Sequence, residues 1–264
     1  MNNSEQSLNE LIDLNQHPIH EQSYREQCKQ TLDSDGALTM PGFLNDRAIS
    51  SIVADGNNNQ HLAFYTGSKH NIYLTESDPN FPANHPRNRE VESTKGCITT
   101  DQIPKNSALH KLYDHQIFRS FLCDVLEENE LHEYADPLSS INLHYASSGQ
   151  ELGWHFDNSS FAITLLLQKP QAGGVFEYVK NVRDADAGEM NYEQAENVLN
   201  GKTTANTLSM DAGALVLFRG RNSMHRVTPV EGDVTRMLAV LAYNTKAGVS
   251  LSESARKTFY GRLG

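Results

Sequence analysis

The sequence predicts one domain of the α+β class, with helices in its first half and a β-sandwich or barrel in its second half. Helix-like periodicity is concentrated in the first 130 residues. The second half contains short runs of β-branched and aromatic residues, which Gly, Pro, Asp or Asn separate. The 264 residues suffice for one sizeable core. Because residues 21–130 show too few strand patterns to stand alone, we predict a single domain over residues 21–264.

The N-terminal part predicts a tail followed by a helix, a strand and a second helix. Residues 1–20 are polar, and we expect them to form a flexible tail. A helical pattern begins at Ser23 and continues to about Leu32. ALTMPGFL (37–44) is typical of a short strand, and Asn45 is placed to cap the helix that follows it.

The next segment, residues 56–106, is rich in Asn, Pro, Ser and Thr and has only short strand-like pieces. A long stretch of this kind is usually disordered or covers a functional site, so we consider it a possible lid. Residues 109–128 then show the apolar stripe of an amphipathic helix. Residues 191–201 predict a short helix or a long loop. The predicted strands are SINLHY (140–145), FAITLLL (161–167), GGVFEYV (173–179), ALVLF (214–218) and RMLAVLAY (236–243).

Charge and composition narrow the choice of partners and compartment. The chain has 22 Lys and Arg against 33 Asp and Glu, a net charge of −11, which disfavours nucleic acid and anionic membranes. Its three cysteines, Cys28, Cys97 and Cys123, form no CxxC pair and are typical of a reducing compartment. We find no signal-peptide pattern and no apolar stretch of membrane-spanning length. We therefore expect a cytoplasmic protein with a small-molecule substrate; a homodimer remains an open alternative.

The segment GWHFDNS (153–159) contains the first candidate site. His155 and Asp157 are two residues apart, so in extended backbone their side chains leave the same face. One such pair is expected by chance in a chain of this composition. His225 strengthens the prediction of a metal site. It lies between two apolar strands, and in an antiparallel barrel this position can lie at the same end as His155 and Asp157. Two histidines and one carboxylate suit non-haem iron(II), although zinc hydrolases use a similar set.

Arg236 favours the iron alternative. It lies eleven positions after His225 and opens the apolar strand RMLAVLAY. An arginine that enters a buried strand is costly unless its guanidinium meets an anion. The distal carboxylate of 2-oxoglutarate would satisfy it, and a structural salt bridge is the alternative.

With these four residues in place, the chain resembles the iron(II)- and 2-oxoglutarate-dependent oxygenase superfamily over residues 36–243. The resemblance implies a double-stranded β-helix (jelly-roll, cupin-like) core with N-terminal helices packed on it. It also implies iron(II) held by His155, Asp157 and His225, with 2-oxoglutarate and O2 as cosubstrates. In NLHYASSGQELGWHFD (142–157) the candidates for cosubstrate contact are Asn142 and Tyr145, for which a structural role is the alternative. The candidates for the substrate pocket are Trp154 and Asn158, for which core packing and a turn are the alternatives.

Three further segments, WHFDNSSFAITLLLQ, GGVFEYVKNVRDA and TKAGVSLSESARKTFYGR, are similar to a small bacterial family that includes lysine halogenases and lysine hydroxylases. Halogenases of this kind have Gly in place of the metal-binding carboxylate, which Asp157 retains here. The resemblance therefore implies a dioxygenase that hydroxylates an unactivated C–H bond of a free amino acid such as lysine. A hydroxylase of peptide or protein side chains and a non-catalytic jelly-roll binding module are the alternatives.

Overall fold

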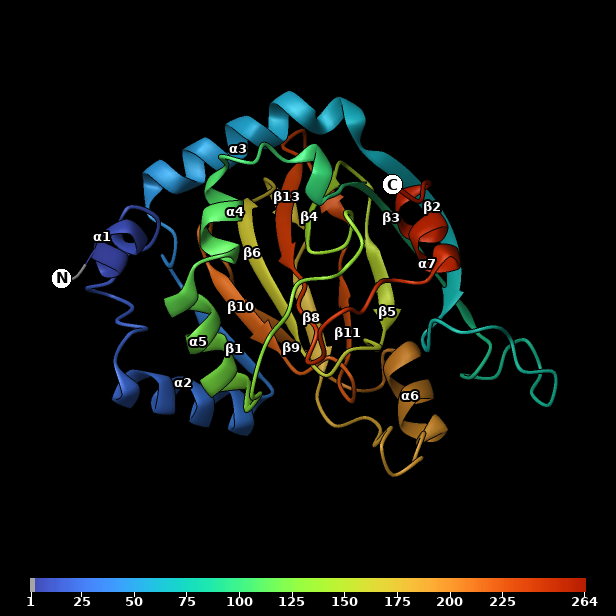
Figure 1. Ribbon diagram of the computed structural model, residues 1–264. Helices are drawn as coiled ribbons and strands as arrows, with labels where there is room; N and C mark the ends of the chain where they lie inside the picture. The colour runs from blue at the N-terminus through green and yellow to red at the C-terminus, as the bar shows by residue number, and fades with distance from the viewer. Residues whose placement is uncertain (1–2) are drawn as a thin grey trace.

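The computed structural model describes residues 3–264, and its centre is a strongly curved antiparallel sheet of eleven strands (Figure 1). Strands distant in sequence lie side by side in it, as the pairing of β1 with β10 shows. β2 (Phe64–Asn71) pairs only with β3, and β7 (Ala172–Gly173) and β12 (Val230–Glu231) form a separate small sheet. The other strands, in their order across the sheet, are β1 (Ala37–Met40), β10 (Leu215–Phe218), β6 (Ala162–Gln168), β13 (Arg236–Leu241), β4 (Ile141–Ala146), β3 (Glu90–Ile98), β5 (Leu152–His155), β11 (Met224–Val227), β8 (Phe176–Val179) and β9 (Asn206–Leu208).

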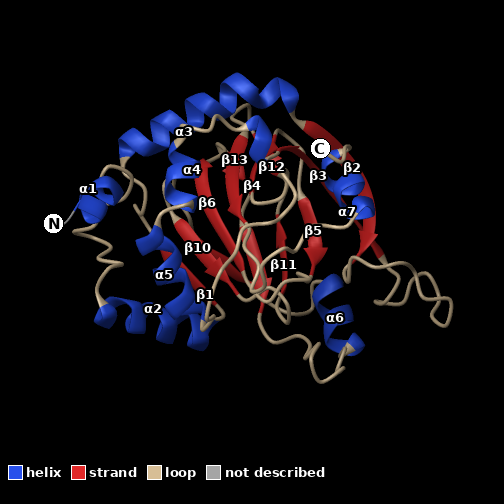
Figure 2. Ribbon diagram, viewed as in Figure 1, coloured by secondary structure: helices blue, strands red, loops and turns tan. Residues whose placement is uncertain are grey.

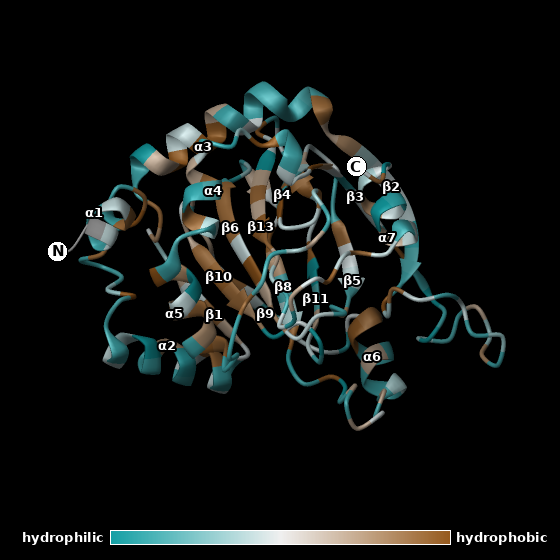
Figure 3. Cartoon of the chain, in the orientation of Figure 1, coloured by the Kyte–Doolittle hydropathy of each residue, from teal (hydrophilic) through white to brown (hydrophobic). Residues whose placement is uncertain are grey.

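The helices surround this sheet, and most of those from the first half of the chain cover one side of it (Figure 2). The predicted double-stranded β-helix with N-terminal helices is confirmed. Apolar residues are concentrated on the central strands β6, β10 and β13, where the helices pack (Figure 3). No helix among the described residues is long and apolar enough to span a membrane. The helices are α1 (Asn3–Asn9), α2 (Gln22–Asp35), α3 (Asp46–Asn59), α4 (Ala108–Tyr113), α5 (Gln116–Leu126), α6 (Tyr192–Leu199) and α7 (Glu253–Tyr260), with short 3-10 turns η1 (Gln60–Leu62) and η2 (Thr100–Gln102).

Local sequence signals explain where several helices begin and end. The Asn45 side chain accepts a hydrogen bond from the Ala48 amide at 2.9 Å, which confirms the predicted cap of α3. The helix predicted over 109–128 is instead two helices, because the backbone of His115 is extended and its Nδ1 accepts from the Ile117 amide. The segment 191–201 contains the helix α6.

The expectation of a flexible tail over residues 1–20 is wrong for the part that the structure describes. Leu8, Ile12 and Ile19 are fully buried in the main core. The residues around these three in sequence are mostly polar, so the apolar residues show no clear periodicity. In the fold, however, the three apolar side chains pack together on the outside of the helical layer. Met1 and Asn2 lie outside the described residues.

Residues 56–106 contain more regular structure than we expected. β2 and β3 form an antiparallel pair over eight residue pairs, from Phe64–Cys97 to Asn71–Glu90. β2 lies at an edge and is largely exposed, which explains its polar composition. The irregular part is the loop of residues 72–89, which projects from the body of the molecule in Figure 1.

Candidate metal centre

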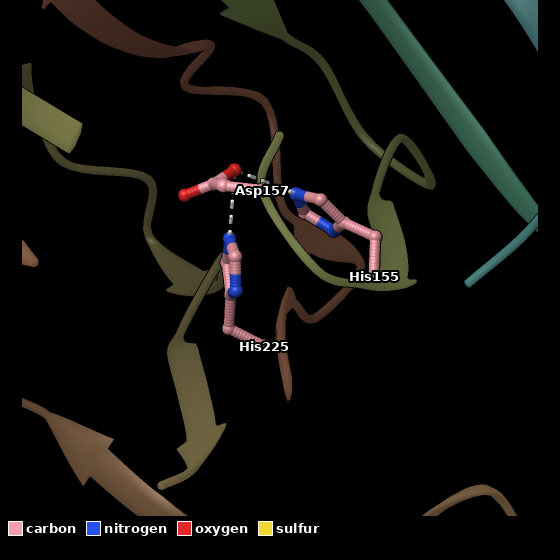
Figure 4. A group of neighbouring side chains, drawn as sticks. All are labelled: His155, Asp157 and His225. Carbon is pink, nitrogen blue, oxygen red and sulfur yellow. Dashed lines mark ion pairs between the residues drawn. The ribbon is translucent and has the colours of Figure 1, made fainter. Parts of the chain in front are cut away.

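Three side chains converge where β5 ends beside β11 (Figure 4). His155 is the last residue of β5, and His225 lies directly opposite it in β11. Asp157 follows β5 by two residues, and its Oδ1 lies 3.8 Å from Nε2 of His155 and 3.5 Å from Nε2 of His225. One ligand atom from each residue lies within 4.8 Å of the others. The structure thus brings together the three residues that the sequence pattern selected.

The main chain prepares both histidines to bind a cation. The Nδ1 of His155 lies 2.8 Å from the carbonyl oxygen of Gly153, and the Nδ1 of His225 lies 3.0 Å from that of Ser223. Because a carbonyl can only accept, each Nδ1 carries a proton, and the Nε2 of each ring is directed toward Asp157. Burial lowers the pKa of His155 to about 3, and the neighbouring His225 contributes to this shift. His155 is therefore a neutral ligand at physiological pH.

Asp157 supplies the negative charge. Burial acts to raise the pKa of its carboxyl group, but His225 and His155 outweigh this effect and hold the pKa below its ordinary value. Its Oδ2 is buried without a hydrogen-bond partner among residues 3–264. An unpaired buried carboxylate oxygen is costly, and a bound cation would offset that cost. Two imidazoles and one carboxylate therefore fit a divalent metal, with open positions of the kind that non-haem iron(II) uses.

A small cavity inside the barrel lies next to this cluster, between β3, β4, β5, β11 and β13. Arg236 lines it at the start of β13 and is only 6% exposed. Burial lowers the pKa of Arg236 to about 10, and no hydrogen bond or ion pair joins its side chain to any described residue. No salt bridge of the kind considered as an alternative is therefore present in the described part of the chain. The guanidinium is available for an anion.

Lys95 of β3 brings a second basic group to the same cavity, and no pattern in the sequence marks it as a site residue. Burial lowers the pKa of Lys95, and the nearby Arg236 lowers it further. The same two causes, burial and neighbouring cations, hold the pKa of His144 well below its ordinary value. The neutral His144 therefore accepts a hydrogen bond at Nδ1 from the Lys95 ammonium, at 3.2 Å. The buried Arg236 and the half-buried Lys95 thus line one cavity with a single carboxylate, that of Glu151, and this excess of basic groups favours an anionic ligand there.

Asn142 and Tyr145, the candidates for cosubstrate contact, use their polar groups within the protein, although Tyr145 also lines the small cavity. The Asn142 amide donates to the Leu138 and Ile141 carbonyls, and its Oδ1 accepts from Tyr260. The Tyr145 hydroxyl is fully buried in the main core and donates to the carbonyl of Gly56 at 2.8 Å. Both polar groups are committed to holding strand β4 against its neighbours, which is the structural alternative.

Of the two residues suggested for the substrate pocket, Trp154 packs in a core cluster with Phe156, on the side of the chain opposite His155 and Asp157. Its ring also contacts the Arg226 guanidinium, 4.9 Å away. Trp154 is therefore a packing residue. Asn158 instead lines an open groove beside the cluster, and its carbonyl accepts from Arg221.

This groove has a volume of about 520 Å³ and runs between β2, the loop after it and α7. His70 of β2 also lines it, and its ring centroid lies 6.4 Å from that of His155. His70 was not selected from the sequence because its segment showed no ligand spacing. Many of the residues that line the groove carry hydroxyl, amide or imidazole groups, among them Ser68, His70, Asn71, Asn158, Ser254 and Thr258.

The fold is similar to those of several solved structures. One is an oxidoreductase of the 2OG-Fe(II) oxygenase family from Burkholderia pseudomallei, which is 13% identical with a TM-score of 0.54, over 86% of this chain and 93% of that one. HygX from Streptomyces hygroscopicus, solved with nickel, 2-oxoglutarate and hygromycin B, is 16% identical with a TM-score of 0.55, over 89% and 95% of the two chains. The epimerase SnoN from nogalamycin biosynthesis is 12% identical with a TM-score of 0.58, over 85% and 83%.

At these identities the similarity concerns the fold. This chain shares with these structures its double-stranded β-helix, which here carries the cluster of His155, Asp157 and His225 between β5 and β11. The chain belongs to the family described as Halogenase D, which it matches over residues 20–259. A search of curated proteins found no match to the sequence.

Proposed function

We propose that the protein is an iron(II)- and 2-oxoglutarate-dependent dioxygenase that hydroxylates a C–H bond of a small polar molecule, such as a free amino acid. The observation that carries the proposal is the pairing of two sites. The cluster of His155, Asp157 and His225 is found together with a small cavity lined by Arg236, whose guanidinium forms no ion pair with any described residue. The cluster suits the metal, and the cavity suits a dicarboxylic cosubstrate that reaches the metal with its other end.

The proposed activity uses three neighbouring sites: the metal cluster, the small cavity and the open groove. The triad would hold iron(II), which with O2 and 2-oxoglutarate supplies the oxidising chemistry that converts C–H to C–OH. One oxygen atom of O2 enters the new hydroxyl group and the other enters succinate, while the cosubstrate loses CO2. In the cavity, Arg236 and Lys95 would bind the distal carboxylate, and His144 orients the Lys95 ammonium. In the groove, Asn158 and His70 would face the substrate next to the metal. The polar groups that line the groove suit a small polar substrate better than an apolar one.

The family name favours halogenation as a second candidate function. In the halogenases that this chain resembles, Gly replaces the metal-binding carboxylate and leaves a coordination position for halide. Asp157 occupies that position here, with its Oδ1 directed at both histidines. We therefore favour hydroxylation over halogenation for this member of the family.

An anaerobic titration of iron(II) and 2-oxoglutarate into metal-free protein tests the proposal. We expect the weak visible charge-transfer band of a chelated 2-oxo acid, and we expect His225→Ala to abolish it. A positive result would justify a screen of free amino acids for substrate-dependent succinate, with chloride present to detect any halogenated product. If the folded protein gives no band, the iron and 2-oxoglutarate assignment is wrong, and a zinc site or a non-catalytic module becomes the better explanation.

A further inference from the structure

Gly220 lies directly behind the carboxylate of Asp157, in the turn between β10 and β11. The Asp157 amide donates to the Gly220 carbonyl at 3.1 Å, so the main chains of the two residues are also joined. A Cβ atom on Gly220 would lie 2.6 Å from Cγ of Asp157 and would overlap with its Oδ2. Any side chain at position 220 would therefore occupy the volume that the carboxylate now fills.

Space, and not backbone conformation, is what requires glycine here. Gly220 is absent from the glycines of positive φ, so an L-amino acid is compatible with its backbone. The atom that a Cβ at position 220 would overlap is Oδ2 of Asp157. This carboxylate has little freedom to move away, because the side chain is short and the main chain of Asp157 is hydrogen-bonded to Gly220. A methyl group at position 220 would displace Oδ2, and the rotation would move Oδ1 away from both histidines.

We propose that Gly220 is a positioning residue that reserves the volume for one metal ligand and so determines what can bind the metal from that side. With Asp157 present, the reserved volume holds its carboxylate. With Asp157 removed, the same volume is open to a small anion, and a methyl group at position 220 would fill it. The inference rests on the proposed function only in that the cluster binds a divalent cation.

Four variants separate this role from a general structural one: Gly220→Ala, Asp157→Gly, the double variant Asp157→Gly/Gly220→Ala, and the control Gly67→Ala. A Cβ at Gly67 would make only an ordinary contact, 3.7 Å from Thr94, and Gly67 also lacks a positive φ. Cobalt(II) is the probe, since its visible absorption reports ligand geometry without turnover. Thermal unfolding of the metal-free proteins is the second measurement.

We expect Gly67→Ala to bind cobalt(II) like the unaltered protein, and Gly220→Ala to bind it about 10–100-fold more weakly, the range seen when the support of a ligand is removed. Asp157→Gly should also bind weakly, and added formate should restore its cobalt(II) spectrum. Formate should not restore the double variant, although Gly220→Ala should not lower the unfolding temperature in the Asp157→Gly background.

The proposal is overturned if Gly220→Ala binds cobalt(II) normally, or if formate rescues the double variant as well as Asp157→Gly. It is also overturned if Gly220→Ala lowers the unfolding temperature equally in both backgrounds, because the glycine would then serve the backbone and not the carboxylate. Failure of the unaltered protein to bind cobalt(II) would instead contradict the proposed metal centre itself.

Discussion

Single residues of the proposed site are prepared by backbone carbonyls. His155 and His225 each donate a hydrogen bond from Nδ1 to a carbonyl two residues earlier, and this fixes the orientation of both rings. Asp157 has no comparable partner for its Oδ2. Without a metal, the cluster therefore has two ordered imidazoles and one carboxylate oxygen, Oδ2 of Asp157, that has no hydrogen-bond partner among the described residues.

His225→Ala tests the ligand assignment. We expect succinate formation to fall below detection, because the metal loses one of two imidazole ligands. The metal-free variant should unfold at a temperature close to that of the metal-free parent, which thermal unfolding monitored by circular dichroism would check. Succinate formation that persists in a folded His225→Ala protein would contradict the assignment.

Lys95→Met tests the second cation of the cavity. We expect 2-oxoglutarate to bind about 10–100-fold more weakly, which corresponds to the loss of one charge-assisted hydrogen bond. The binding of 2-oxopentanoate, which has the same chain length but no distal carboxylate, should hardly change. The readout is the charge-transfer band in anaerobic titrations of both 2-oxo acids.

The stability of Lys95→Met separates ligand binding from a structural role. Removing a half-buried cation that has no acidic partner should leave the metal-free protein as stable as before, or more stable. If Lys95 had a structural role instead, Lys95→Met would make the metal-free protein less stable. A clear drop in the unfolding temperature, with unchanged 2-oxoglutarate affinity, would exclude a role in the cavity.

Some residues of the site could be predicted and others could not. His155 and Asp157 are close in sequence, so strand geometry alone places them on one face, and His225 follows from the antiparallel pattern. Lys95 is half-buried only because β4 and β13, which are distant from β3 in sequence, line the same cavity. A lone lysine in a polar segment gives no sign of that burial.

Among the elements, β4 carries Asn142 and Tyr145, the two candidates for cosubstrate contact, on opposite faces. Asn142 shares a face with His144, whose Nδ1 contacts Lys95, and Tyr145 shares a face with Leu143 in the main core. Tyr145 faces the helical layer, and its hydroxyl joins β4 to the end of α3 through Gly56. The hydroxyl therefore stabilises the packing of two elements.

Tyr145→Phe tests this structural role. We expect the free energy of unfolding to fall by about 1–2 kcal/mol, because a buried hydrogen bond to a carbonyl is lost. The affinity for 2-oxoglutarate should stay unchanged. Urea unfolding would measure the difference, with Tyr65→Phe on the exposed strand β2 as a control expected to change stability by about 0.5 kcal/mol or less. Weaker 2-oxoglutarate binding by Tyr145→Phe would revive the original assignment.

Elements with local signals were predicted well, and those that depend on tertiary contacts were not. The cap at Asn45 and the apolar runs of the core strands are local signals, and the elements predicted from them are present in the structure. β2 lies at a sheet edge and has a polar sequence, so only its pairing with β3 makes it a strand. The number of helices over 109–128 depended on one extended residue, His115, which no periodicity reveals.

In the whole molecule, the N-terminal segment is part of the domain. Its fully buried leucine and isoleucines extend the core over the helical layer, on the side away from the candidate metal centre. Removing this segment would expose apolar surface of α5 and α3.

Leu8→Ala measures how strongly the segment is held. We expect a loss of about 2–5 kcal/mol in the free energy of unfolding, the usual range for a buried leucine. Gln6→Ala, an exposed position of the same helix, should change it by about 0.5 kcal/mol or less. Denaturant unfolding of both variants is the measurement, and equal small effects would show that the segment contributes little to stability.

The pairing of His155 with His225 has a consequence for how the protein should be handled. β5 and β11 come from distant parts of the chain, and their register is interrupted by a bulge just beyond the histidine pair. A cation held by both would act as a cross-link between them. At a concentration one hundred times its Kd, such a ligand adds about 2.7 kcal/mol to the stability of the folded state. Resistance to heat or to proteases would then record how much of a preparation contains metal, before any substrate is known.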